Sequence, residues 1–150
     1  MGRFHFKLEA VLGYRRTVEE QRLRALAAVQ AELAACGARL DALRAERSQT
    51  LDEWPTRVDV IDAGRREAYL ASLCARIEGE ERVRESIEER LSVARAALLA
   101  ARQAAEALET LRERALDAHR RDALLREQAA LDEAAVLRHA RAAAADGRGS

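Results

Sequence analysis

Apolar residues recur at alternating steps of three and four in both halves of the sequence. The first series is Leu26, Val29, Leu33, Cys36, Leu40 and Leu43. The second series is Leu70, Leu73, Ile77, Glu80, Arg84, Ile87, Leu91, Ala94, Leu98, Ala101, Ala105 and Leu108, with two charged members. Such spacing is the seam of a coiled coil. Ala, Leu, Arg and Glu, which favour helix, supply 97 of the 150 residues. The sequence therefore predicts an all-α fold.

A single proline divides the two series. Pro55 lies in a segment, residues 52–64, that also holds Thr56, Asp59, Asp62 and Gly64. Proline disfavours helix at the residue before it, and Asp62 is a candidate cap for the following helix. We predict a helix over about residues 6–51, a turn at 52–64, a second helix over about 65–143 and a frayed tail at 144–150. The prediction is one elongated domain, residues 1–150.

Folding about this turn gives an antiparallel two-helix coiled-coil hairpin with unequal arms. At 1.5 Å per residue the arms span roughly 70 Å and 115 Å. Residues beyond about 110 are then expected to have no partner within the chain. In this register residue 36 faces about residue 78, so Gly37 and Gly79 lie at one level, which is either a weak point or a close approach. We expect Glu80 and Arg84, four residues apart, to pair with each other.

Several functional classes are excluded by composition. Lys plus Arg and Asp plus Glu number 26 each, so the net charge is zero and nucleic acid is not the expected partner. Cys36 and Cys74 lack metal spacing and are expected to be reduced thiols. No apolar run is long enough to insert into a membrane, and residues 1–7 lack the apolar stretch of a signal peptide. No catalytic, metal or cofactor motif occurs. We expect a non-enzymatic cytoplasmic protein, at most peripheral to a membrane.

Motifs near both ends carry a resemblance to a known family. The first is Phe4-x-Phe6-x-Leu8-x-x-Val11-Leu12-x-x-Arg15. The second is Leu108-Glu-x-Leu111-x-Glu-Arg114, followed by Glu127-Gln128-x-x-Leu131-Asp132-Glu133-x-Ala. Together they resemble the flagellar export protein FliJ family over essentially the whole chain. The resemblance implies a component of the flagellar type III protein export apparatus, similar in fold to the stalk subunit of rotary ATPases.

The resemblance also implies partners. Members of the family insert into the hexameric export ATPase ring, promote its assembly, link it to the export gate in the membrane and handle export chaperones. We expect the open end of the hairpin to enter the ring and the acidic turn end to face outward. The candidate partner-binding residues are Phe4, Phe6, Leu8, Leu12, Tyr14, Arg15, Leu108, Leu111, Gln128, Leu131, Asp132 and Glu133.

Other interpretations stay open at this point. Phe4 and Phe6 either staple the first helix onto the second or contact a partner. The chain is alternatively the equivalent stalk of an injectisome secretion system, which neighbouring genes would reveal. It is alternatively a general coiled-coil scaffold unrelated to secretion, which would sediment as a dimer.

Overall fold

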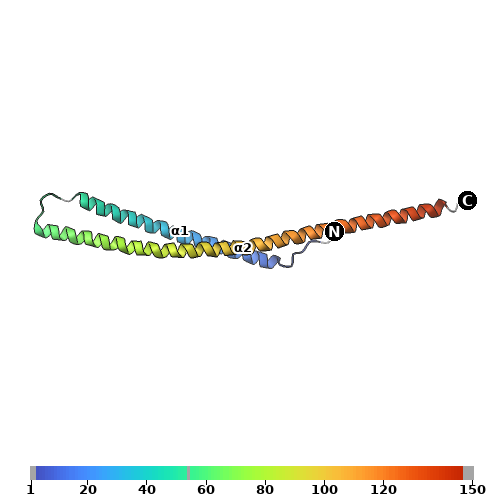
Figure 1. Cartoon of the computed structure of the whole chain (residues 1–150), viewed down its shortest axis with the longest axis horizontal. Helices are drawn as coiled ribbons and strands as arrows, with labels where there is room; N and C mark the ends of the chain where they lie inside the picture. The colour runs from blue at the N-terminus through green and yellow to red at the C-terminus, as the bar shows by residue number, and fades with distance from the viewer. Residues whose placement is uncertain (1–2, 54, 147–150) are drawn as a thin grey trace. The chain divides into compact units, whose positions relative to one another are not determined.

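The computed structural model describes residues 3–53 and 55–146, and these form two long helices joined by a short connection (Figure 1). Helix α1 spans Glu9–Asp52 (44 residues) and helix α2 spans Val60–Asp146 (87 residues). No strand occurs among the described residues. The two helices pack against each other, which confirms the predicted all-α helical hairpin with arms of unequal length.

The helix ends differ by a few residues from the predicted ones. Helix α1 begins at Glu9 rather than near residue 6, and the Glu9 N–H donates a 3.2 Å hydrogen bond to the Phe6 carbonyl. Helix α2 begins five residues before the predicted start, because the Asp59 carbonyl already accepts from the Ala63 N–H at 2.9 Å. Asp59, rather than Asp62, therefore takes the position immediately before the helix. Helix α2 continues to Asp146, and residues 147–150 of the predicted tail lie outside the described residues.

Contacts group the chain into two units, which are described separately below. Unit 2 comprises Arg16–Gln103, and unit 1 comprises Met1–Arg15 together with Ala104–Ser150. Each unit pairs a piece of α1 with a piece of α2 that runs in the opposite direction. The long sequence separation within each pair follows from the hairpin connectivity.

The core of unit 2 is the predicted seam. Its buried members are Val29, Cys36, Leu40, Leu43, Leu73, Ile77, Ile87 and Leu91, with Leu26, Leu33 and Leu70 partly buried against them. Leu98 and Ala101 continue the buried stripe of α2. The spacing of three and four keeps one narrow stripe of each helix facing the other, which accounts for a core made of seam residues.

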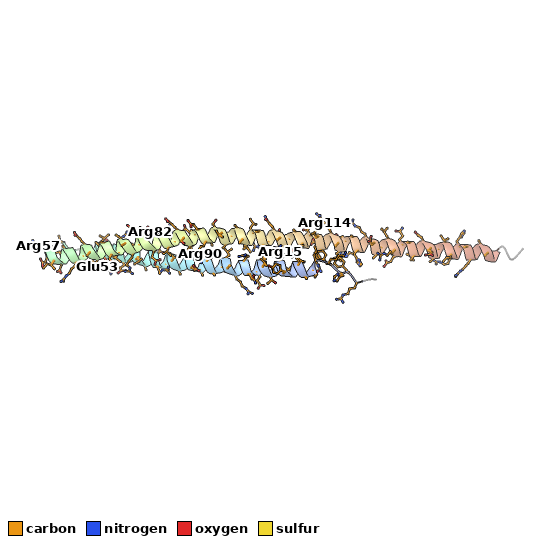
Figure 2. The ribbon with its side chains drawn as sticks, turned by 90° about the horizontal axis from the view of Figure 1, so that it is seen from below. Arg15, Glu53, Arg57, Arg82, Arg90 and Arg114 are labelled. Atoms are coloured by element: carbon orange, nitrogen blue, oxygen red, sulfur yellow. The ribbon has the colours of Figure 1, made fainter. Side chains whose placement is uncertain are left out.

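Ion pairs across the two helices accompany this core. Arg90 donates two hydrogen bonds to the Glu32 carboxylate, at 2.6 and 3.1 Å, from the side of α2 that faces α1 (Figure 2). Arg44 reaches Glu81 at 2.8 Å. Because these groups are largely exposed, each pair adds little stability, and their main effect is on helix register.

The two charged members of the second seam do not pair with each other as predicted. Glu80 instead accepts from Arg39 Nε at 3.1 Å and from the Cys36 thiol at 3.5 Å, both across the hairpin. Arg84 Nε lies 3.5 Å from a carboxylate oxygen of Glu88, yet it is buried and makes no hydrogen bond within the described structure. Glu80 does not pair with Arg84 because Arg39 presents its guanidinium to Glu80 from the opposite helix.

The glycines at this level are not required by a close approach. The Cys36 thiol lies 3.5 Å from the Glu80 backbone carbonyl, so the residues next to Gly37 and Gly79 contact each other across the hairpin, two residues away from the predicted register. A methyl group built on either glycine would meet no atom within 4 Å, and neither glycine has a positive φ. The structure does not support the close approach, and the weak point stays a prediction.

Candidate functional site: the open end of the hairpin

The segment before α1 is held against α2 within unit 1. Phe6 is buried, and Leu12, one and a half turns further on, is fully buried. The Phe4 ring lies against the His119 ring, with centroids 5.6 Å apart and planes tilted by 53°. The aromatic pair at Phe4 and Phe6 therefore staples the chain onto α2, which is the first of the two interpretations that the sequence left open.

Further contacts extend this attachment. Arg112 Nε donates a 2.9 Å hydrogen bond to the Glu9 carboxylate. An open groove of about 1060 Å³ runs between residues 3–8 and the α2 side chains Ala115, Ala118, His119 and Asp122. The prediction that residues beyond about 110 lack a partner sets the boundary too early, because Arg112 contacts Glu9 and His119 contacts Phe4.

Beyond this point α2 has no cover within the described structure. From Leu124 to Ala144 every residue is exposed. The five large apolar side chains of this segment, each more than half exposed, are Leu124, Leu125, Leu131, Val136 and Leu137. A lone exposed apolar side chain is ordinary on a protein surface, but five within fourteen residues of one helix make this segment the candidate functional site.

Most of these side chains share one face of the helix. At 100° per residue, Leu124, Gln128, Leu131 and Ala135 form one row, with steps of four, three and four. Leu125, Asp132 and Val136 form the adjacent row. We name the six residues Leu124, Leu125, Gln128, Leu131, Asp132 and Val136 the C-terminal face. Leu137 points about 140° away from Leu124.

The predicted partner-binding residues separate into two groups. Phe6 and Leu12 are buried within the chain, while Phe4 and Leu108 are half-buried. The exposed ones are Leu8, Tyr14, Arg15, Leu111, Gln128, Leu131, Asp132 and Glu133. Glu133 lies on the side of α2 opposite Leu124, so the Leu131-Asp132-Glu133 motif does not act as one surface.

The sequence prediction missed Leu124, Leu125 and Val136 as site residues. Their signal was present, because they are the large apolar residues that follow the end of the regular seam. The pattern predicts a site only weakly, because the spacing of apolar residues is looser there than in the regular seam.

The opposite end of the hairpin presents a second exposed surface. Leu51, Val60 and Ile61 are exposed, and Val60 keeps 85% of its accessible surface. Acidic residues occur beside them in the sequence at Asp52, Glu53, Asp59 and Asp62, of which Asp62 lies 3.8 Å from Arg65, and Arg57 is the basic residue of the connection (Figure 2). We name residues 51–53 and 57–62 the acidic tip.

Perturbed ionisation in this molecule follows ion pairs and hydrogen bonds rather than a catalytic cluster. The hydrogen bond from Arg90 lowers the pKa of Glu32, and the hydrogen bond that Tyr69 donates to Glu46 raises the pKa of Tyr69. Burial, followed by the hydrogen bond to Glu80, raises the pKa of Cys36. Within the described residues no group of His, Cys, Asp and Glu has the arrangement of a metal site. None of the described helices combines the length and hydropathy needed to cross a membrane.

Comparison with known families decides what kind of hairpin this is. The family model described as "Flagellar FliJ protein" matches residues 4–144. The chain belongs to the flagellar FliJ protein family. No curated protein and no solved structure matches the sequence. Membership of this family implies a role related to flagellar protein export, and the match includes both the N-terminal staple and the C-terminal face.

Proposed function

We propose that this FliJ-family chain is the stalk of the flagellar export ATPase: it inserts its open end into the hexameric ring, promotes ring assembly and ATP hydrolysis, and links the ring to the export gate. The observation that carries the proposal is the C-terminal face, which has four exposed large apolar side chains on a helix segment without cover in the described structure. A ring pore with an apolar lining would supply that cover.

The packing of unit 1 supports this orientation. The N-terminal staple holds Phe6 and Leu12 against α2, so the C-terminal face begins directly after a supported stretch of helix. A supported helix loses little conformational freedom on binding, which favours insertion as a preformed element. Tyr14, Arg15 and Leu111 are exposed on the same unit and are the proposed contacts at the rim of the pore.

The acidic tip is the proposed contact for the second partner. The exposed apolar residues of the tip and the acidic residues near them in the sequence would fit a partner surface that is apolar with a basic rim. On this proposal the tip faces the export gate, and the chain works in the cytoplasm at the inner-membrane export apparatus. Handling of export chaperones is assigned to exposed residues outside the C-terminal face, such as Glu133.

The ring-insertion proposal is tested with charge substitutions on the two sides of α2. The double variant Leu124→Glu/Leu131→Glu places two carboxylates on the C-terminal face, whereas Leu137→Glu places one on the other side of the same segment. Both changes are at exposed positions, so circular dichroism and thermal unfolding are expected to stay unchanged.

Purified export ATPase is mixed with each variant at low protein concentration, and hexamer formation and ATP hydrolysis are measured. We expect stimulation by the double variant to fall at least tenfold, because burying two carboxylates in an apolar pore is costly. Leu137→Glu is expected to retain stimulation. Full stimulation by the double variant would show that the C-terminal face does not enter the ring.

A further inference from the structure

One level of the unit 2 hairpin combines several features that weaken helices and their packing. Gly37 of α1 and Gly79 of α2 lie beside Cys36 and Glu80, which contact each other at 3.5 Å. Glycine in a helix interior is unfavourable relative to alanine, because its backbone loses more freedom on folding. Both helices therefore have the unfavourable helix propensity of glycine next to the same contact, the one between Cys36 and Glu80.

Neither glycine is explained by sterics. A Cβ at either position would meet no atom within 4 Å, and the backbone at both is ordinary helix. An alanine would fit at both positions and would make the hairpin more stable. The packing of the hairpin thus leaves the two glycines without a structural reason.

The same level interrupts the apolar seam. Between Ile77 and Ile87, both buried, the seam positions of α2 are Glu80 and Arg84. Arg84 Nε is buried and makes no hydrogen bond in the described structure, although a carboxylate oxygen of Glu88 lies 3.5 Å away, so its burial is only partly compensated. Beside Glu80 an open surface groove of about 390 Å³ is lined by Arg39, Leu43, Arg76 and Gly79 among others.

From these observations we infer that the hairpin has a built-in opening point: residues around Gly37 and Gly79 unwind locally while the apolar layers on either side stay packed. The opening lets the hairpin flex at this level without coming apart. Cys36 reports on it, because its side chain is fully buried when the layer is closed and reaches solvent when both helices unwind. This inference concerns the hairpin itself and holds for any partner.

The test is native-state labelling of Cys36 with a small thiol reagent in a Cys74→Ser background, which removes the exposed thiol. The reagent concentration is varied to confirm that labelling is limited by a rapid opening equilibrium. The full chain is used throughout. Gly37→Ala and Gly79→Ala are compared with Gly13→Ala and Gly64→Ala, two helical glycines elsewhere that also have open space around a Cβ.

If the opening is local, Gly37→Ala and Gly79→Ala each slow the labelling about fivefold, and the two together about 30-fold. Gly13→Ala and Gly64→Ala then leave the rate within about twofold, because their segments stay helical during the opening. Arg84→Met, which removes the buried Nε while keeping the apolar stem, is expected to slow labelling as well.

Three results would overturn the inference. Equal slowing by all four alanine variants would mean that Cys36 is reached by unfolding of the whole chain. No slowing by Gly37→Ala and Gly79→Ala would mean that exposure does not involve unwinding at the glycines. An unlabelled native Cys36, under conditions in which the urea-unfolded chain reacts completely, would mean that the layer does not open.

Discussion

Replacing Leu91 by Ala tests whether the narrow seam holds the hairpin together. Leu91 is 7% exposed and belongs to the core of unit 2, so truncation removes nearly the whole contribution of its side chain. Three lost carbon atoms at about 0.8 kcal/mol each give about 2.4 kcal/mol, and an unfilled cavity adds to this. We expect the free energy of unfolding to fall by about 3 kcal/mol.

Leu99 provides the matched control, because it lies in the same helix and the same unit but is 58% exposed. Leu99→Ala is expected to change the free energy of unfolding by less than about 0.5 kcal/mol. Leu33, which is only partly buried, is expected to fall between the two, at about 1–2 kcal/mol.

Urea unfolding followed by circular dichroism at the helical band measures all three variants, with the slope of the transition checked for constancy. A loss below 1 kcal/mol for Leu91→Ala, or equal losses for Leu91→Ala and Leu99→Ala, would refute the assignment of the seam.

Three further predictions follow from individual contacts. A hydrogen bond to the Glu46 carboxylate raises the pKa of Tyr69 above its value in the unfolded chain, so this contact stabilises the fold below the unfolded-state pKa and is lost as pH rises through the folded-state pKa. In ultraviolet titration of a Tyr14→Phe variant, Tyr69 should therefore ionise at higher pH in the folded chain than in the same chain in urea. Coincident titration curves would contradict the contact. Because Arg90 lowers the pKa of Glu32, the pair contributes to folding stability above the unfolded-state pKa, and this contribution is lost as pH falls through the folded-state pKa. Glu32→Gln should therefore remove part of the acid sensitivity of unfolding. Unchanged acid sensitivity would count against the pair. Phe6→Ala should release the N-terminal staple, so limited proteolysis should cleave residues 3–8 much faster than in the parent chain while the hairpin core stays resistant; equal cleavage rates would argue that the staple is not what orders this segment.

The all-α hairpin and its seam followed from the sequence because they depend on a repeated pattern. The steps of three and four through Leu26–Leu43 and Leu70–Leu108 require a stripe on each helix, and one proline separates them. Every buried residue of the unit 2 core is a member of these two series.

Features that depend on a single long-range contact were not predictable in the same way. The partner of Glu80 was set by Arg39 on the other helix, which local spacing cannot reveal. The cover over residues 112–122 came from the non-helical segment at Phe4 and Phe6, and its contact with His119 joins residues more than a hundred positions apart. Leu124, Leu125 and Val136 follow the regular seam in the sequence, and their exposure depends on where that cover ends.

The most direct test of the stalk proposal is to locate the ring contact on the chain. A photo-crosslinking amino acid is placed at Leu131 on the C-terminal face or at Ile61 in the acidic tip, and each chain is irradiated with the assembled export ATPase. If the C-terminal face enters the ring, we expect strong cross-linking to the ATPase from Leu131 and little from Ile61. Strong cross-linking from Ile61 with none from Leu131 would contradict it.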